Sequence, residues 1–245
     1  MEKLKLAKHL INFIDESPSN YFACINTKNI LNEKGFTELL ETEEWKLKKG
    51  GKYFVTINDS GIIAFTIGSE KISKYGYKIA ASHTDSPGFL IKPNPEINRK
   101  GFNILNTEVY GGPILSTWFD RPLSFSGRVF VESDNAFKPK KYFIKYDKDL
   151  FIIPSLCIHQ NRGVNDGMAI NAQKDTLPLV TITDEKEKFS LKKLLAKQLK
   201  VKEDKILSYD LNLYSREKGC LLGANEEFIS VGRLDNLAAL HAGLM

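Results

Sequence analysis

The chain has 245 residues, of which 42% are hydrophobic and 27% are charged, and its formal net charge is +5. This composition is typical of a soluble globular protein with one large domain or two smaller ones, and it excludes disorder over the whole length. Lysine is mixed with acidic residues along the chain and forms no stripe with aromatic residues. We therefore expect no nucleic-acid partner.

Three cysteines, Cys24, Cys157 and Cys220, lie far apart in the sequence. Their number and spacing predict neither a disulfide framework nor a zinc ribbon, and they suit a reducing compartment. The first residues, Met1–Glu16, carry Lys and Glu throughout and lack the apolar core of a secretory signal. No stretch approaches the length of a membrane span. The sequence thus predicts a cytoplasmic protein with no membrane partner.

The N-terminal region reads as two helices. Apolar residues recur at helical spacing from Leu4 to Ile14, which predicts an amphipathic helix over residues 2–15. Ser19 can cap a second helix that runs towards Gly35, and glycine suits the left-handed position after a helix.

Short apolar runs follow. Residues 53–57 and 62–67 flank the turn sequence Asn58-Asp59-Ser60-Gly61, which predicts a β-hairpin. Residues 77–82 are predicted to form a third strand that ends at His83.

From about Asn94 to Asn225 short strand-like runs dominate, which indicates a β-rich unit inserted into the first domain. The predicted strands cover 102–110, 124–132, 142–146 and 206–214, and a helix is predicted over 191–199. We place the first part of the outer domain at 1–93, the inserted β-rich domain at 94–225, and the second part of the outer domain at 226–245.

His83 and Asp85 are the first residues that could carry chemistry. Residues two apart on a strand point to one face, so both side chains could face one ligand. Imidazole is a good zinc ligand, and a carboxylate beside it can hold the ring through its other N–H or bind a second metal. An ordinary structural histidine remains the alternative.

Asp235 follows a Gly-Arg-Leu turn and precedes an apolar helix. A carboxylate at this position either caps the helix or bridges two cations. His159 shares a strand face with Cys157 by alternation, and a histidine in ordinary surface or core packing is the alternative to a site residue there. We interpret the pair Glu226-Glu227 as a solvated loop rather than a catalytic acid pair.

Five segments together resemble the M18 family of metallo-aminopeptidases, in the family's order and over essentially the whole chain. They are Ser17-Pro18-Ser19, Ala81-Ser82-His83-Thr84-Asp85-Ser86-Pro87, Tyr110-Gly111-Gly112-Pro113 with Ser116-Thr117-Trp118-Phe119-Asp120-Arg121-Pro122-Leu123, Ile158-His159 with Asn161-Arg162, and Gly223-Ala224-Asn225-Glu226-Glu227-Phe228-Ile229 with Gly232-Arg233-Leu234-Asp235-Asn236-Leu237.

The resemblance implies an α/β fold, with an α/β/α sandwich catalytic domain interrupted by a β-rich dimerisation domain. Dimers in this family build homo-oligomers up to dodecamers. It implies that His83 and Asp235 bind metal and that Asp85 is the catalytic-site aspartate that orients His83. His159 is implied to be either a third metal ligand or a residue that contacts substrate in a neighbouring subunit.

The implied activity is hydrolysis of the N-terminal residue of peptides, acidic residues included, by water that two divalent cations activate. Zinc is the expected cofactor, and cobalt or manganese suits similar ligands. The family's catalytic glutamate pair and remaining ligands should follow Asp235, and this chain stops at Met245 without them. The alternative is a truncated, inactive paralogue that acts as an assembly or binding subunit.

Overall fold

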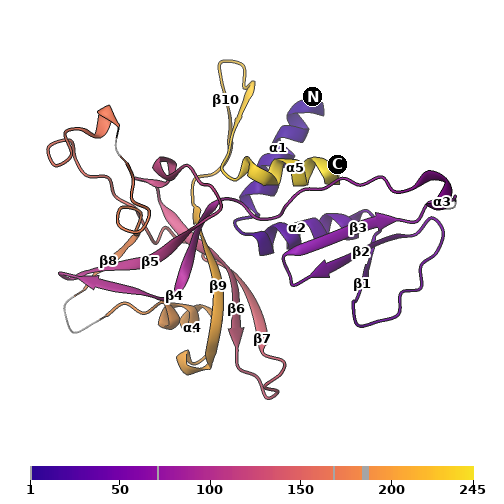
Figure 1. Cartoon of the computed structure of the whole chain (residues 1–245), viewed down its shortest axis with the longest axis horizontal. Helices are drawn as coiled ribbons and strands as arrows, with labels where there is room; N and C mark the ends of the chain where they lie inside the picture. Colours follow the sequence, from indigo (N-terminus) through magenta and orange to yellow (C-terminus); the bar gives the residue numbers. More distant parts are fainter. Residues whose placement is uncertain (1, 71, 168, 184–187) are drawn as a thin grey trace. The chain divides into compact units, whose positions relative to one another are not determined.

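The computed structural model describes residues 2–70, 72–167, 169–183 and 188–245, and its fold is mixed α/β, as the resemblance predicts (Figure 1). The elements are α1 (Glu2–Asp15), α2 (Asn20–Glu33), β1 (Thr37–Leu39), β2 (Lys52–Ile57), β3 (Gly61–Thr66), α3 (Ile72–Tyr75), β4 (Gly88–Arg99), β5 (Phe102–Tyr110), η1 (Leu115–Trp118), β6 (Leu123–Val131), β7 (Lys140–Lys145), η2 (Val164–Asp166), β8 (Leu179–Ile182), α4 (Leu191–Leu199), η3 (Glu203–Lys205), β9 (Ile206–Ser215), β10 (Cys220–Leu222), β11 (Phe228–Ser230) and α5 (Leu234–Leu244).

The chain divides into two compact units, and unit 2 interrupts unit 1 in sequence. Unit 1 comprises residues 1–86 and 218–245, and unit 2 comprises residues 87–217. The sequence pattern predicts junctions after residues 93 and 225, so the observed units differ from the predicted domains in two elements. All of β4 lies in unit 2, where it pairs with β5, and the β10–β11 hairpin lies in unit 1.

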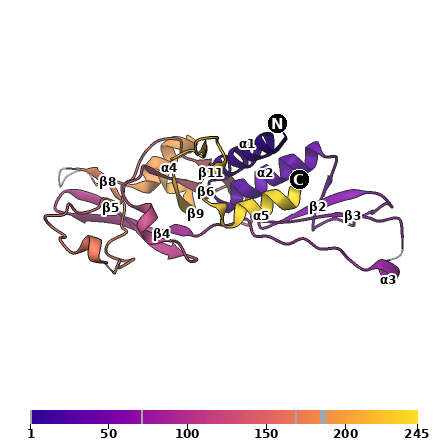
Figure 2. The same cartoon turned by 90° about the horizontal axis from the view of Figure 1, so that it is seen from above.

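Unit 1 is built around the helices α1, α2 and α5, which lie side by side (Figure 2). The predicted helix over 2–15 is confirmed by α1, whose Phe13 and Ile14 are buried in a cluster with Ala23 of α2 and with Leu237 and Leu240 of α5. Burial of such side chains contributes about 1.5–3 kcal/mol each. This apolar cluster fixes α5, and with it the residues at the start of α5.

The end of α2 and the hairpin after it follow the local sequence signals. Gly35 adopts φ +77°, and the Phe36 N–H donates to the Leu31 carbonyl at 3.0 Å, which closes the helix as predicted. Strands β2 and β3 form the predicted hairpin. Its turn places Asn58 and Asp59 at positive φ, where these residue types are tolerated.

The prediction of a strand over 77–82 is wrong. The segment is irregular, and Tyr77 and Ile79 are 76% and 85% exposed. Its alternating apolar residues match a strand pattern, but a strand forms only where a neighbouring strand pairs with its backbone. In the described part of the chain, the sheets include no strand paired with this segment.

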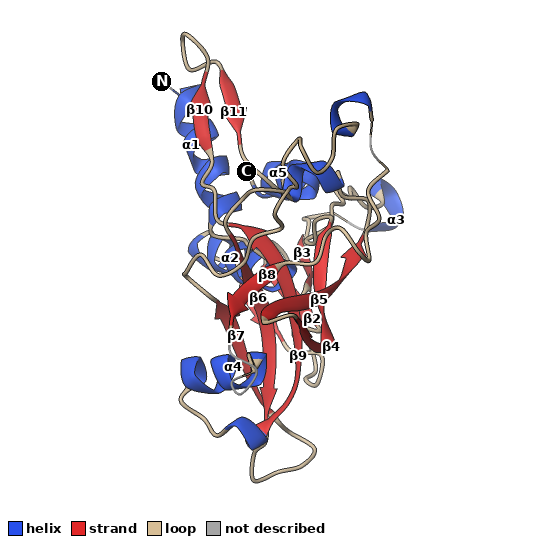
Figure 3. Cartoon of the chain, turned by 90° about the vertical axis from the view of Figure 1, so that its left-hand side faces the viewer, coloured by secondary structure: helices blue, strands red, loops and turns tan. Residues whose placement is uncertain are grey.

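Unit 2 contains a six-stranded antiparallel sheet in the order β7-β6-β9-β4-β5-β8, beside α4 (Figure 3). Leu191 and Leu195 of α4 are fully buried in the same cluster as Leu123, Phe125 and Val129 of β6. The predicted strands 102–110, 124–132, 142–146 and 206–214 and the helix 191–199 are confirmed within two residues by β5, β6, β7, β9 and α4.

Strand β4 has no counterpart among the predicted strands. It contains Pro93 and Pro95, which cannot donate to a sheet ladder and argue against a strand. In the structure the register between β4 and β5 shifts between Ile91 and Glu96. This irregularity places both prolines outside the regular pairing, so β4 continues on either side of them.

At Gly127 the backbone of β9 leaves no room for a side chain. A Cβ added to Gly127 would lie 1.9 Å from the Asp210 carbonyl oxygen across the β6–β9 ladder. We expect Gly127→Ala to lower the free energy of unfolding by about 3 kcal/mol or more, because backbone must move. Gly112→Ala is the control, since a Cβ there meets nothing within 4 Å. Denaturant melts that show equal stability for the two variants would contradict this.

A histidine pair joins α1 to α5 and predicts a pH dependence. His9 Nδ1 lies 2.7 Å from Nε2 of the buried His241, whose ring also packs on Phe13. Burial, and secondarily His9, lowers the pKa of His241. The folded chain therefore resists protonation, so stability is full above the unfolded histidine pKa of about 6.5 and falls as pH drops below it.

We expect the denaturant concentration at the unfolding midpoint of the wild-type chain to decrease when the pH is lowered from 7.5 to 5.5. The fall should be smaller in His241→Gln, which cannot titrate. An equal fall in both proteins would exclude His241 as the cause.

None of the helices in the described residues is long and apolar enough to cross a membrane.

Candidate active site

Asp85 contacts one of the two nitrogens of the His83 ring, Nδ1, and so determines which nitrogen carries the ring proton. His83 Nδ1 lies 3.0 Å from both the Asp85 carboxylate oxygen Oδ1 and the Asp85 backbone carbonyl. Both neighbours are acceptors, so Nδ1 carries the proton and donates it to them. In the neutral ring the other nitrogen, Nε2, then presents a lone pair. This is the arrangement in which a carboxylate orients a metal-binding histidine.

The lone pair of His83 Nε2 faces Asp235. The distance from Nε2 to Asp235 Oδ1 is 3.4 Å, and the two side chains are 51% and 72% exposed. With the proton on Nδ1, this contact brings two electron-pair donors together, and a cation between them would relieve the repulsion. Two ligands of a tetrahedral zinc ion, each at about 2.0–2.1 Å, are about 3.4 Å apart. The donor types and their spacing therefore fit a divalent cation such as zinc.

Asp235 does not act as the helix cap that the sequence allows as an alternative. The N-cap position of α5 is Arg233, at φ 56°, and the backbone of Asp235 is not helical. The Arg233 side chain donates to the Ile14 carbonyl at 3.0 Å, and Leu237 is buried against α1 and α2. The start of α5 is thus held from both sides of Asp235, and its carboxylate lies beside His83.

Thr84 anchors the loop that carries His83 and Asp85. Its hydroxyl donates to the Ser60 carbonyl at 2.6 Å and so ties the loop to the β2–β3 turn. No sequence pattern of their own predicts a role for Thr84 or for Arg233. Their roles lie in bonds to backbone carbonyls distant in sequence, and the signal that could have pointed to them is their place inside the two blocks of the family resemblance.

The structure brings His83, Asp85 and Asp235 together in unit 1, whereas His159 belongs to unit 2. His159 is exposed in a turn in which the Gln160 N–H donates to the Cys157 carbonyl at 2.9 Å. The predicted strand face shared by Cys157 and His159 is therefore wrong, because the chain turns here instead of extending.

Among the described residues, no group of three or more His, Cys, Asp and Glu side chains is arranged to hold a metal ion. The facing donors are His83 and Asp235, with Asp85 behind the ring. Glu226 and Glu227 lie exposed in the β10–β11 turn, where Glu227 accepts the Asn225 N–H at 2.8 Å, as the solvated-loop interpretation predicts.

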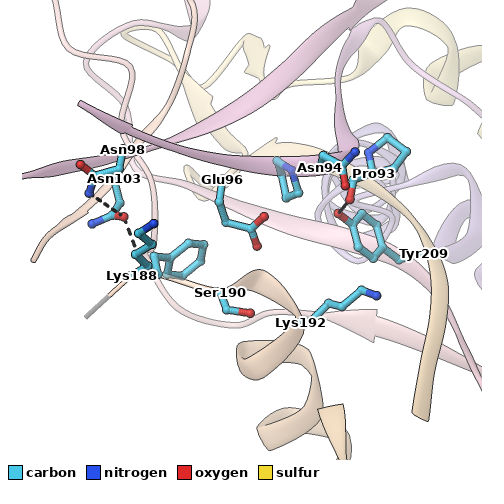
Figure 4. A pocket seen from close by; sticks show the side chains of 11 residues that line it. Pro93, Asn94, Glu96, Asn98, Asn103, Lys188, Ser190, Lys192 and Tyr209 are labelled. Carbon is cyan, nitrogen blue, oxygen red and sulfur yellow. Dashed lines mark hydrogen bonds between the residues drawn. The ribbon is translucent and has the colours of Figure 1, made fainter. Parts of the chain in front are cut away.

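A hollow of about 420 Å³ lies in unit 2 between β4, β9 and the start of α4 (Figure 4). None of the predicted site residues lines it. Glu96 points into it, and the Tyr209 hydroxyl donates to the Pro93 carbonyl at 3.1 Å. The Glu96 carboxylate accepts the Leu191 N–H at 2.8 Å, which satisfies the first turn of α4. The polar groups of the hollow thus serve the fold.

A family model and curated relatives match this chain. The model of the family described as aminopeptidase I zinc metalloprotease (M18) matches residues 13–245. The probable M18 family aminopeptidase 2 of Clostridium acetobutylicum is 50% identical over 99% of this chain and 57% of its own length. Its counterpart in Clostridium novyi is 47% identical, again over 99% and 57%.

Solved structures share the fold. A chain in the cryo-EM structure of the Ape4 and Nbr1 complex has a TM-score of 0.88 at 34% identity, over 98% of this chain and 49% of that one. The mApe1 dodecamer of S. cerevisiae has a TM-score of 0.80 at 22% identity, over 99% and 57%. The fold of this chain is thus the one found in the family described as aminopeptidase I zinc metalloprotease.

The chain belongs to the M18 family. It spans about 57% of the length of the curated relatives it matches.

The contact between Asp85 and His83 predicts a measurable effect on metal binding. We expect Asp85→Ala to weaken zinc binding by roughly 10–100-fold, because the ring loses the acceptor that fixes its tautomer and orientation. Titration calorimetry of the wild-type chain and the variant measures this. Glu44→Ala, which removes an exposed carboxylate of the same unit, should leave the affinity unchanged. Equal affinity of Asp85→Ala and wild type, with binding lost in His83→Ala, would refute the orienting role.

Proposed function

We propose that this chain contributes His83 and Asp235 to the metal site of an aminopeptidase that hydrolyses the N-terminal residue of peptides. The observation that carries the proposal is the 3.4 Å approach of His83 Nε2 to Asp235 Oδ1, with Nδ1 of the same ring occupied by Asp85. This donor pair suits zinc, which the family description names. The names of the curated relatives support the activity.

Each of these side chains has a distinct task in the proposal. His83 offers one nitrogen lone pair, and Asp85 holds the proton on the opposite nitrogen throughout. Asp235 offers two carboxylate oxygens, of which one faces His83, so the other can serve a second cation. When bound, two divalent cations lower the pKa of water to about 7 and polarise the scissile carbonyl.

The surroundings of the pair suit access by a peptide. The side chains of both His83 and Asp235 are more than half exposed, so substrate and water can reach them. We propose peptide substrates with acidic N-terminal residues among those accepted, and His159 as a residue that either binds metal or contacts substrate in a neighbouring subunit. The general base that moves the proton to the leaving amine is proposed to come from the part of the relatives that this chain does not span.

We propose that unit 2 serves as the dimerisation domain of a homo-oligomer that builds towards a dodecamer. The described part of unit 2 carries a sheet core of its own, which suits an independent assembly module. A structural neighbour of this chain is a dodecamer.

We propose a reducing, cytoplasmic compartment, and the three free cysteines suit it.

A fusion protein tests the activity. It joins residues 1–245 of this chain to the remaining C-terminal portion of the Clostridium acetobutylicum relative, which is 50% identical over the shared part. We expect zinc-dependent release of N-terminal residues from short peptides. His83→Ala should lower kcat/KM at least about a hundredfold, because the cations supply several kcal/mol of transition-state stabilisation. Glu44→Ala is the matched control.

The polypeptide 1–245 by itself should release no more product than its own His83→Ala variant. A folded, zinc-loaded fusion protein without peptidase activity would refute the proposal and favour the assembly role. Robust metal-dependent turnover by residues 1–245 alone would show that the chain needs no further ligands.

A further inference from the structure

The block Thr117–Pro122 is the most distinctive segment of the sequence that the proposed function leaves without a role. It runs from η1 to the start of β6 in unit 2. Asp120 stands in it at φ 56°, a left-handed conformation that Asp, Asn and Gly adopt at little cost. In this conformation the backbone N–H and the side chain of Asp120 both bond to one neighbouring segment.

Asp120 makes two hydrogen bonds to one neighbouring segment. Its N–H donates to the Ile153 carbonyl at 2.9 Å, and its carboxylate oxygen Oδ1 accepts the Ser155 N–H at 2.8 Å. Phe119 also forms a bridge with Ile153, which is fully buried. Hydrogen bonds from the backbone and side chain of Ser155 lower the pKa of Asp120, so its carboxylate is ionised and the bond is charge-assisted.

The next two residues of the block bind a different segment. Arg121 forms an ion pair with Glu217, and the Pro122 carbonyl accepts the Arg216 N–H at 2.9 Å. Residues Asp120–Pro122, here called the clasp, therefore fasten residues 153–155 on one side and residues 216–217 on the other. The half of the clasp that Asp120 provides can be altered while the Arg121 half stays in place.

The segment that Asp120 fastens leads directly to His159. After the fully buried Ile153 the chain is exposed from Pro154 to Gln160, and it turns at Cys157–Gln160. The bond to Ser155 is a tie at the base of this exposed loop. Without it the base of the loop moves back to Ile153, and two more residues give the loop up to about 7 Å of additional reach.

We propose that Asp120 is a positioning residue for His159, which it holds in place through the Ser155 N–H. The inference rests on the proposed function, in which His159 contacts metal or substrate. Displacing a contacting group by about 1 Å can cost as much as a hundredfold in rate, so a tie of this kind controls how well His159 acts.

The conformation of Asp120 permits closely matched variants. Asp120→Asn keeps both the left-handed conformation and an acceptor oxygen for the Ser155 N–H. Asp120→Gly keeps the conformation and removes the acceptor. Arg121→Ala opens the other half of the clasp, and an exposed ion pair of this kind contributes little to stability.

Amide hydrogen exchange of the 245-residue chain tests the positioning directly. We expect Asp120→Gly to raise the exchange rates of residues 155–163 about tenfold or more, while β6 and β9 exchange as in the wild type. Asp120→Asn and Arg121→Ala should stay within about threefold of the wild type. Unchanged exchange in the loop, or an equal rise in β6 and β9, would overturn the proposal.

Kinetics of the fusion protein tests whether the effect passes through His159. Asp120→Gly should lower kcat/KM about tenfold or more, and Asp120→Asn should restore most of it. In a His159→Ala background, Asp120→Gly should change kcat/KM by less than about twofold, because the group it positions is gone. Additive losses would overturn the link to His159. A fusion protein without activity would count against the proposed function, while the exchange rates would still decide whether Asp120 holds the loop.

Discussion

The candidate site depends on the packing of α5 against α1 and α2. Leu237 and Leu240 bury against Phe13, Ile14 and Ala23, and this apolar contact carries the start of α5 to the loop of His83. Asp235 and His83 are far apart in sequence, so no local signal could hold them within 3.4 Å. A core of ordinary hydrophobic side chains thus sets the spacing of two donors that are themselves exposed.

The two donors are held by different means, and the difference suits a metal site. The orientation of His83 comes from a side chain two residues away, since Asp85 fixes the ring through Nδ1. The position of Asp235 comes from the Arg233 bond to the Ile14 carbonyl and from buried Leu237. Backbone and core therefore carry the constraint, and the two donor atoms that face each other stay available. Such pre-organisation lowers the entropy cost of binding an ion.

Sequence reasoning succeeded where structure is local. Helix α1 follows from apolar spacing, and the turn at Asn58–Asp59 follows from residues that tolerate positive φ. It failed where the outcome depends on a distant partner. Residues 77–82 have the alternation of a strand, but no strand among the described residues pairs with them, and β4 has prolines that a register shift accommodates.

The candidate site shows the same division. The spacing of His83 and Asp85 can be read from the sequence, because two residues decide it. The place of Asp235 beside them came from the family resemblance alone, since it follows from tertiary packing. The bonds of Thr84 and Asp120 to backbone groups are invisible to any pattern of side-chain types.

Bonds from a side chain to a distant backbone group explain how exposed residues of the candidate site keep a defined position. His83, Asp235 and His159 are all exposed, so none is fixed by burial of its own side chain. Thr84 fastens the loop of His83 to the Ser60 carbonyl, Arg233 fastens the start of α5 to the Ile14 carbonyl, and Asp120 fastens the base of the His159 loop to Ser155. Each tie joins a side chain to a backbone group, so it survives changes in the neighbouring side chains. A loop can therefore present an open, hydrated functional group, provided that one polar residue close to its base is fixed in this way.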